Sequence, residues 1–189
     1  MRRAPAFIDI SLTNCQHRVK ESRMTDPLGP IVSSAHLADS ALPALSELEF
    51  ALTMANHAFQ RWMVRCMAAA GAQMSPLEVL ILHQVAHRDR PKSLADLCLV
   101  LNIGDTHLAN YAIRKLASQG LVRTGRKGKE KTVAITARGA ALCQHYATLR
   151  AALLLPGVPL VQDDLSRLAG LLRALSGSYD QAARSAAAR

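Results

Sequence analysis

Residues 93–136 constrain the fold of this chain more than any other segment. An apolar stretch with helical spacing begins after Ser93 and stops at the tripeptide NIG. A second such stretch begins after Asp105 and ends before Gly120. Ser and Asp are favoured at helix N-caps because their side-chain oxygens accept hydrogen bonds from the first free N–H groups. Asn and Gly tolerate the left-handed backbone of a tight turn. The pattern therefore predicts two short helices joined by a sharp turn.

The periodicity of the sequence changes after Gly120. Two runs rich in β-branched residues, 121–124 and 132–135, flank the glycine-containing segment GRKGKEK. Such runs around a short polar loop are typical of a β-hairpin. Thr136 then supplies an N-cap for a further helix. Two helices followed by a hairpin are the layout of a winged helix-turn-helix, so this is the fold that we expect here.

The two faces of the second helix differ in chemistry. The face expected to be buried carries Leu108, Ala109, Ala112, Ile113 and Leu116. The other face carries His107, Asn110, Tyr111, Arg114, Lys115 and Ser118. An ordinary solvated helix face is a mixture of Glu and Lys, whereas this face offers hydrogen-bond donors, acceptors and one aromatic ring. Such groups suit the edges of bases.

Positive charge is concentrated in the same region. Between Asp105 and Arg138 there are eight Lys and Arg residues against two acidic residues, a net +6 of the chain's +9. A concentrated positive face attracts an acidic polymer such as DNA. An alternative is that lysines at a hairpin tip only keep the edge of a sheet soluble. Next to a helix-turn-helix, the charge favours duplex DNA as the partner.

Three phrases resemble the MarR family of winged-helix transcription regulators: SPLEVLILHQVAHR, SLADLCLVLNIGDTHLANYAIRKLASQGLV and KTVAITARGAAL. The resemblance covers residues 45–175. It implies that the second helix enters the major groove and that the hairpin, or wing, follows the backbone or the minor groove. One departure is that GRKGKEK lacks the acidic D-x-R type of motif usual in that wing. The expected DNA-binding residues are Thr106, His107, Asn110, Tyr111, Arg114, Lys115, Arg123, Arg126, Lys127, Lys129 and Lys131.

The rest of the chain predicts a mainly α protein in which this hairpin is the only β structure. Residues 75–139 form the expected DNA-binding domain, with a capping box and a proline at its start. Residues 45–74 and 140–189 read as long helices with apolar seams. These seams either pack within one subunit or form an intertwined homodimer, which the resemblance also implies. A twofold dimer would set two recognition helices about 34 Å apart, one turn of DNA.

Residues 1–44 differ from the remainder in being rich in proline and lacking a sustained period. We interpret them as an N-terminal arm, partly irregular, with a short helix near residues 35–40. Two roles are open at this point. The arm is either disordered or wrapped around a partner subunit.

Other function classes have little support in the sequence. No P-loop, nucleophile elbow or dinucleotide fingerprint is found, so we expect neither an enzyme nor a cofactor. His83 and His87 have the spacing of metal ligands, but no Cys, Asp or Glu cluster lies near them in sequence. Cys15 could be a sensing thiol, although only His17 and Arg18 stand beside it. The four cysteines read as small apolar residues, and no segment predicts a membrane span or a signal peptide.

The sequence therefore predicts a cytoplasmic transcription regulator, a repressor, that binds a pseudo-palindromic DNA site as a homodimer. The resemblance implies release by a small-molecule effector, which the sequence does not identify. The alternative is a winged-helix adaptor that binds a protein through the same helix. An adaptor would need apolar anchors on that face.

Overall fold

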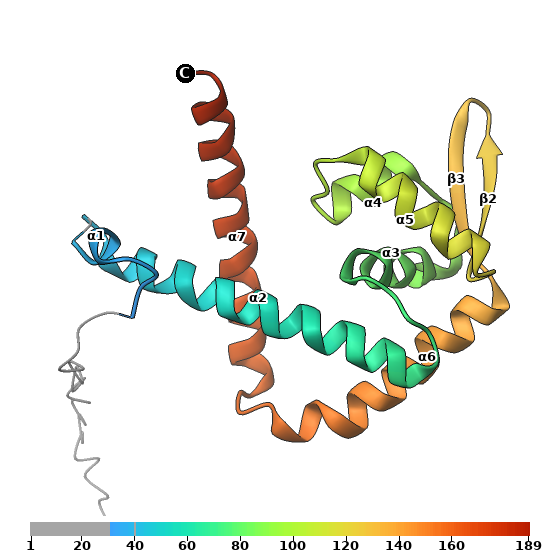
Figure 1. The fold of residues 1–189 in the computed structure, drawn as a ribbon, viewed down its shortest axis with the longest axis horizontal. Helices are drawn as coiled ribbons and strands as arrows, with labels where there is room; N and C mark the ends of the chain where they lie inside the picture. The colour runs from blue at the N-terminus through green and yellow to red at the C-terminus, as the bar shows by residue number, and fades with distance from the viewer. Residues whose placement is uncertain (1–30, 40) are drawn as a thin grey trace, which may run out of the picture. The chain divides into compact units, whose positions relative to one another are not determined.

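A computed structural model describes residues 31–39 and 41–189 (Figure 1). The expectations for Cys15 and for the greater part of the N-terminal arm lie outside these residues. The chain divides into two units, residues 1–54 and 55–189. In the first unit, the short helix expected near residues 35–40 is present as α1, Ala35–Ala38. It is followed by α2, Pro43–Ala70, which continues into the second unit.

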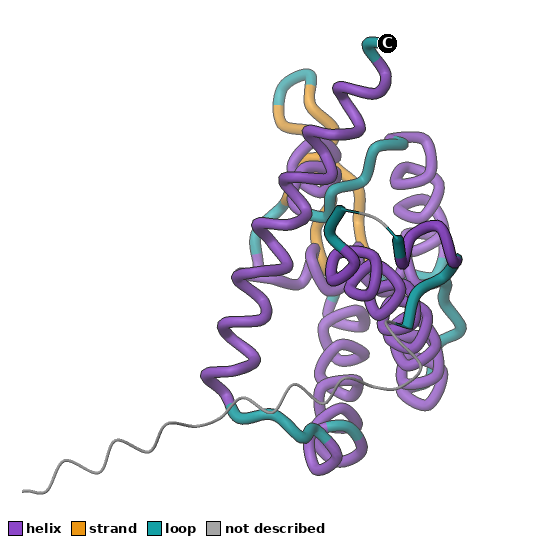
Figure 2. The backbone as a smooth tube through the Cα atoms, turned by 90° about the vertical axis from the view of Figure 1, so that its left-hand side faces the viewer, coloured by secondary structure: helices purple, strands orange, loops and turns teal. Residues whose placement is uncertain are grey.

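The winged helix-turn-helix is confirmed element by element. Its helices are α3, Pro76–Ala86, α4, Leu94–Val100, and α5, Thr106–Ser118. The wing is formed by the antiparallel strands β2, Val122–Lys127, and β3, Glu130–Ile135. Behind the wing come α6, Ala137–Leu153, and α7, Gln162–Ala187, with a 3-10 turn, η2, at Leu155–Gly157. The described part of the chain is thus mainly helical with one small sheet (Figure 2).

The sequence did not predict a third strand. After α3 a 3-10 turn, η1, His87–Asp89, leads into β1, Lys92–Ser93, which pairs antiparallel with β3. The sheet order is β1-β3-β2. A strand of two residues has no period of its own, and its strand geometry comes only from pairing with β3. The predicted fold class, mainly α with a small hairpin wing, is confirmed, and β1 adds a strand that the sequence did not indicate.

Side-chain caps fix the starts of the helices as expected. Ser75 and Glu78 form a reciprocal capping box at α3, and Ser93 and Asp96 form another at α4. The carboxylate of Asp105 accepts a hydrogen bond of 2.8 Å from the backbone N–H of His107 at the start of α5. Because these caps satisfy N–H groups that have no partner within the helix, the boundaries are local properties of the sequence.

The core lies where α2, α3, α5 and α6 meet the base of the wing. The side chains of Met67, Ile81, Leu82, Leu97, Ile113, Leu116 and Val133 are fully buried in it. Leu108 was expected on the buried face of α5 but is 56% exposed. It lies in the first turn of α5, just after the turn that joins α4 and α5, and does not reach the core, so that expectation was wrong.

Gly139 fixes how closely α6 approaches the wing. The hydroxyl of Thr136 accepts from the N–H of Gly139, and its single hydrogen is shared between the carbonyls of Gly120 and Leu121. A methyl group on Gly139 would lie 2.1 Å from the Leu121 carbonyl oxygen and 2.7 Å from a methyl carbon of Ile135. Only glycine fits here, because the nearest obstacle is backbone and cannot rotate away.

We predict that Gly139→Ala lowers the free energy of unfolding by about 1–3 kcal/mol, the usual cost of overpacking. The matched control is Gly177→Ala in α7, where an added methyl group meets nothing within 4 Å. The control should be neutral or stabilise the protein by about 0.5–1 kcal/mol, since alanine favours a helix. Urea unfolding followed by circular dichroism measures both. If Gly139→Ala and Gly177→Ala had the same free energy of unfolding, the close approach of Gly139 to the Leu121 carbonyl would be contradicted.

Candidate nucleic-acid interface

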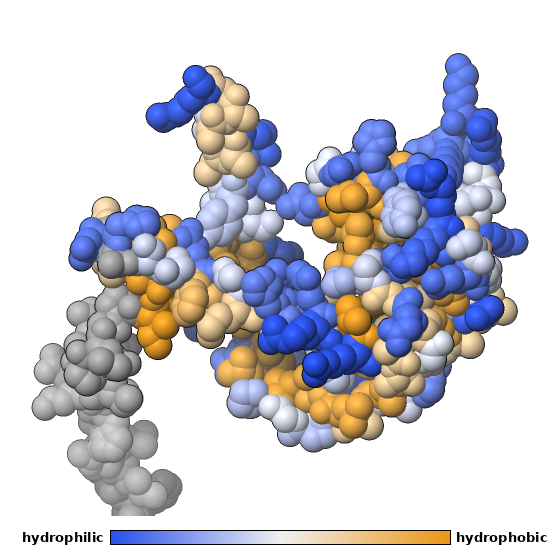
Figure 3. All heavy atoms as spheres, in the orientation of Figure 1, coloured by the Kyte–Doolittle hydropathy of each residue, from blue (hydrophilic) through white to orange (hydrophobic). Residues whose placement is uncertain are grey.

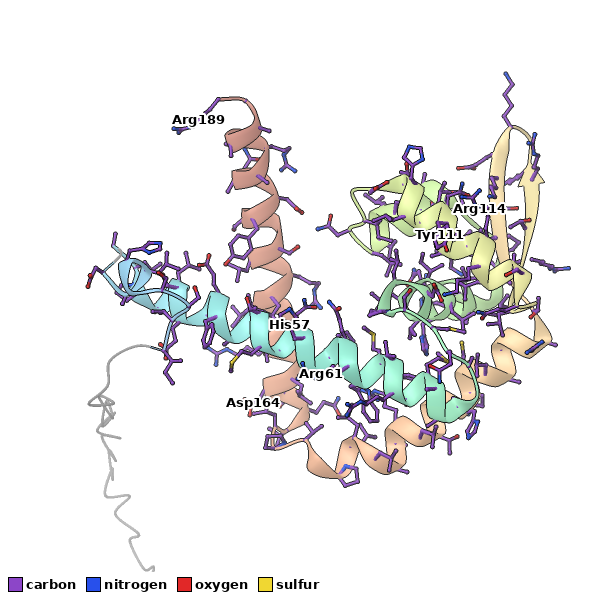
Figure 4. All side chains as sticks on the ribbon, viewed as in Figure 1. His57, Arg61, Tyr111, Arg114, Asp164 and Arg189 are labelled. Carbon is purple, nitrogen blue, oxygen red and sulfur yellow. The ribbon has the colours of Figure 1, made fainter. Side chains whose placement is uncertain are left out.

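The helix α5 presents a polar face beside the wing. Its opposite face is anchored in the core by Ala109, Ala112, Ile113 and Leu116. Five predicted DNA-binding residues are exposed on α5: Thr106, His107, Tyr111, Arg114 and Lys115. Asn110 is half-buried between them. Tyr111 and Arg114 both come from α5, next to the hairpin (Figure 4).

The wing carries the second part of the candidate interface. Arg123, Arg126, Lys127 and Lys129 are exposed on it, and hydrophilic side chains cover the hairpin in Figure 3. The turn at the tip is tight because Gly128 adopts a left-handed backbone, with φ of 63°. Four exposed cations on one small hairpin attract a polyanion such as the DNA backbone.

Lys131 links the wing to the helix. It lies on β3 opposite Arg126, and its ammonium group donates a hydrogen bond of 2.7 Å to the side-chain oxygen of Asn110. Lys131 and Asn110 are both half-buried. The sequence predicted both residues as DNA contacts, but not that they contact each other, since they lie 21 positions apart.

Lys115 lies in a different environment from the other predicted residues. Its ammonium group forms an ion pair of 3.0 Å with Glu78 of α3, whose side chain is only 4% exposed. The same Glu78 side chain accepts from the backbone N–H of Ser75 in the capping box. Lys115 therefore compensates a buried carboxylate and holds α5 against α3. This contact was not foreseen from the sequence.

The sequence also gave no sign of the role of Lys92. This side chain is 7% exposed and donates hydrogen bonds to the carbonyl of Val85 in the last turn of α3 and to those of His87 and Arg90 in the turn that follows. It satisfies carbonyl groups that have no partner within the helix. Arg88 adopts a left-handed backbone in the same turn, with φ of 61°. Lys92 thus closes the connection from α3 to β1.

The two histidines that have the spacing of metal ligands, His83 and His87, lie in different surroundings. Nδ1 of His83 lies 2.9 Å from the Val79 carbonyl oxygen, and the imidazole meets the ring of Tyr146 edge-on at 4.6 Å. His87 is exposed at the end of α3. Among the described residues, no group of His, Cys, Asp or Glu could hold a metal ion. In the same residues, no helix combines the length and hydropathy needed to span a bilayer.

Three cysteines lie within the described residues. Cys66 and Cys98 are buried, and Cys143 is half-buried. Burial raises the pKa of the Cys143 thiol to about 11 and raises that of Cys66 as well. The expectation of small, apolar cysteines is confirmed for these three. Because the thiolate is the nucleophilic form, a raised pKa makes both thiols slow to react near neutral pH.

A hollow of 480 Å³ lies where the end of α2 meets α6 and the base of the wing. Apolar side chains, among them Ala72, Leu121 and Leu142, line it together with the polar residues Arg138 and His145. Tyr146 is buried and Trp62 half-buried against the core, so both contribute to packing.

Comparison with known proteins agrees with this geometry. A family model described as "Winged helix DNA-binding domain" matches residues 74–139. No curated protein matches the sequence of the chain. The match confirms that the central part of the chain is a winged helix-turn-helix domain.

Three solved structures show the extent of the structural similarity. A MarR variant from E. coli complexed with operator DNA has a TM-score of 0.59 at 18% identity, covering 72% of this chain and 98% of that chain. The transcriptional regulator BldR from Sulfolobus solfataricus has 0.59 at 21%, covering 71% and 99%. CouR from Rhodococcus jostii RHA1, bound to p-coumaroyl-CoA, has 0.59 at 15%, covering 75% and 95%. The chain thus has the fold of MarR-type winged-helix regulators, which confirms the resemblance found in the sequence.

The role of the ion pair between Lys115 and Glu78 can be tested by substitution. We predict that Lys115→Met lowers the free energy of unfolding by about 1–3 kcal/mol, because it leaves the Glu78 carboxylate buried without its counter-ion. The double variant Lys115→Met with Glu78→Gln should recover part of the loss, since the amide carries no charge. Thermal and urea unfolding measure both. A Lys115→Met variant as stable as the wild type would show that the ion pair is unimportant.

Proposed function

We propose that the protein is a sequence-specific DNA-binding transcription regulator that acts as a homodimer on a pseudo-palindromic site. The observation that carries this proposal is the exposed polar face of α5 beside a wing with four exposed cations. Arg114 can donate in bidentate fashion to guanine from the middle of α5. The wing cations Arg123, Arg126, Lys127 and Lys129 suit phosphates, which carry little sequence information.

The homodimer is supported by apolar surface that the described chain leaves uncovered. Exposed large apolar residues follow one another from the end of α6 through the first half of α7: Leu153, Leu155, Leu160, Val161, Leu165, Leu168 and Leu171. On α2, Phe59 is 52% exposed. So many exposed large apolar side chains in one segment are typical of an interaction surface. We infer that residues 45–74 and 140–189 form the dimer interface around the DNA-binding domain, residues 75–139.

The remaining parts of the proposal follow from the class of protein. A dimer that occupies a promoter acts as a repressor by default, and it would do so in the cytoplasm and without catalysis. CouR is bound to p-coumaroyl-CoA in its solved structure. By analogy we propose that a small-molecule effector releases this protein from DNA.

One observation favours the adaptor as a second candidate function. Leu108 is 56% and Tyr111 61% exposed on α5, and exposed apolar and aromatic side chains can anchor a protein partner. The same two side chains can also contact the methyl groups of thymine. The net positive charge of the wing supports DNA, and the comparison of Arg114→Ala with Lys129→Ala described below separates the two candidates.

We predict that the affinity for duplex DNA falls steeply with salt concentration and that the wing lysines account for part of this fall. Replacing Lys127 and Lys129 together with Gln should reduce the slope of log K against log[salt] by about two units per protomer, or about four for the dimer, since each lost phosphate contact contributes about one unit. The control variant, Arg184→Gln with Arg189→Gln, removes the same charge from the end of α7 and should leave the slope unchanged. Fluorescence anisotropy over a salt series gives the slopes, and an unchanged slope in the wing variant would remove the wing from the interface.

Arg114→Ala should cost about 1–3 kcal/mol per half-site on the preferred duplex and relax the preference at one base pair per half-site. Lys129→Ala should weaken binding to preferred and scrambled duplexes about equally. If both variants lose affinity equally on the two duplexes, α5 does not read sequence. If neither loses affinity on either duplex, the adaptor is the better interpretation.

The proposed dimer can be tested by introducing a charged side chain into the exposed apolar surface. Phe59→Asp should give monomers or aggregates and lose cooperative DNA binding, because a carboxylate cannot be buried between subunits without a partner. Phe59→Leu, which keeps an apolar side chain, should remain dimeric. Sedimentation velocity at micromolar concentration distinguishes them, and a folded wild-type monomer there would refute the dimer.

A further inference from the structure

The contact between Lys131 and Asn110 fixes which way the Asn110 amide points. The ammonium group of Lys131 is a donor only, so the atom 2.7 Å from it must be the amide oxygen. This chemistry assigns the oxygen and nitrogen of the amide without reference to any other contact. The Asn110 nitrogen, with its two N–H donors, is therefore the end left for a partner.

Asn110 occupies a position from which a recognition helix reads bases. Thr106, Asn110 and Arg114 follow one another at intervals of four residues, so they lie along one face of α5. Thr106 and Arg114 are exposed, and Asn110 lies half-buried between them with Lys131 of the wing against its oxygen. The wing and the helix thus contribute side chains to one polar cluster.

We propose that Asn110 and Lys131 act together to select a guanine. This assignment rests on the proposed DNA-binding function. Lys131 takes one of the two acceptor positions of the Asn110 oxygen and holds its positive charge beside the other. The amide nitrogen, with its two N–H donors, is then the group that Asn110 presents to a base. Guanine carries two acceptors, N7 and O6, on its major-groove edge, whereas adenine sets a donor beside its acceptor. Guanine is the purine that matches a cluster of donors.

Lys131 is accordingly a positioning residue that acts through Asn110. An asparagine without such a partner pairs with adenine, because its oxygen accepts from N6 while its nitrogen donates to N7. The ammonium group engages this oxygen and adds a positive charge that opposes the N6 donor. Removing the charge should therefore change which base is preferred, in addition to weakening binding.

The test is selection of bound duplexes from a randomised pool, followed by affinity measurements on the selected site and its single-base variants. The wild type should prefer guanine over adenine at one position per half-site, on the order of tenfold. Lys131→Met should lose this preference and shift it toward adenine. Asn110→Ala should lose it without acquiring another, and adding Lys131→Met to Asn110→Ala should not change the base profile further. Lys131→Arg, which keeps a cationic donor, should retain the guanine preference.

The matched control is Lys129→Met, which removes the same charge from the exposed tip of the wing and should weaken all duplexes without altering any base preference. If Lys131→Met behaves in the same way as Lys129→Met, Lys131 is a phosphate contact and the assignment is wrong. A wild type that shows selectivity only at other positions also overturns it while leaving the proposed function intact. A wild type without any preference between duplexes overturns both.

A second measurement tests the contact in the protein without DNA. In nitrogen-15 NMR spectra, Lys131→Met should shift the side-chain amide resonances of Asn110, and Lys129→Met should leave them in place. Unshifted resonances in Lys131→Met would overturn the assignment even if that variant binds DNA too weakly for selection.

Discussion

Burial of one face of α5 is the interaction on which the rest of the candidate interface depends. Ala109, Ala112, Ile113 and Leu116 are almost completely removed from solvent, and the two larger side chains alone contribute about 1.5–3 kcal/mol each. A helix of 13 residues is marginal by itself in water, so its stability comes from this packing. Because the buried face is fixed, the opposite face is fixed too, and its polar side chains are presented in a defined direction.

Two contacts of lysine ammonium groups connect α5 to its surroundings and have different consequences. Lys115 joins the helix to α3 through the buried carboxylate of Glu78, which is a stabilising contact. Lys131 joins it to the wing through Asn110, which is a contact within the candidate interface. The first sets how α5 sits on the domain. The second links the chemistry of the helix to that of the wing, so that the two are not independent DNA contacts.

Local signals allowed much of the fold to be predicted. The caps Ser75, Ser93, Asp105 and Thr136 all lie where the sequence indicated, because an N-cap bonds to backbone N–H groups only two or three positions away. The pairing of β1 with β3 and the exposure of Leu108 could not be predicted in this way. Both depend on which distant segments the tertiary structure brings near, and no periodicity records that.

The sequence by itself determined the order of the helices, the hairpin, the concentration of positive charge and the identity of the polar residues on α5. Helical and strand periods, caps and net charge are properties of neighbouring residues, so they can be read without a structure. Only the tertiary structure decided how these residues are used. Lys115 and Lys131 are both lysines predicted to contact DNA, yet one meets Glu78, 37 positions away, and the other meets Asn110, 21 positions away. A long, flexible side chain takes whatever partner the packing of helices and strands brings within reach, and that packing is a property of the whole domain.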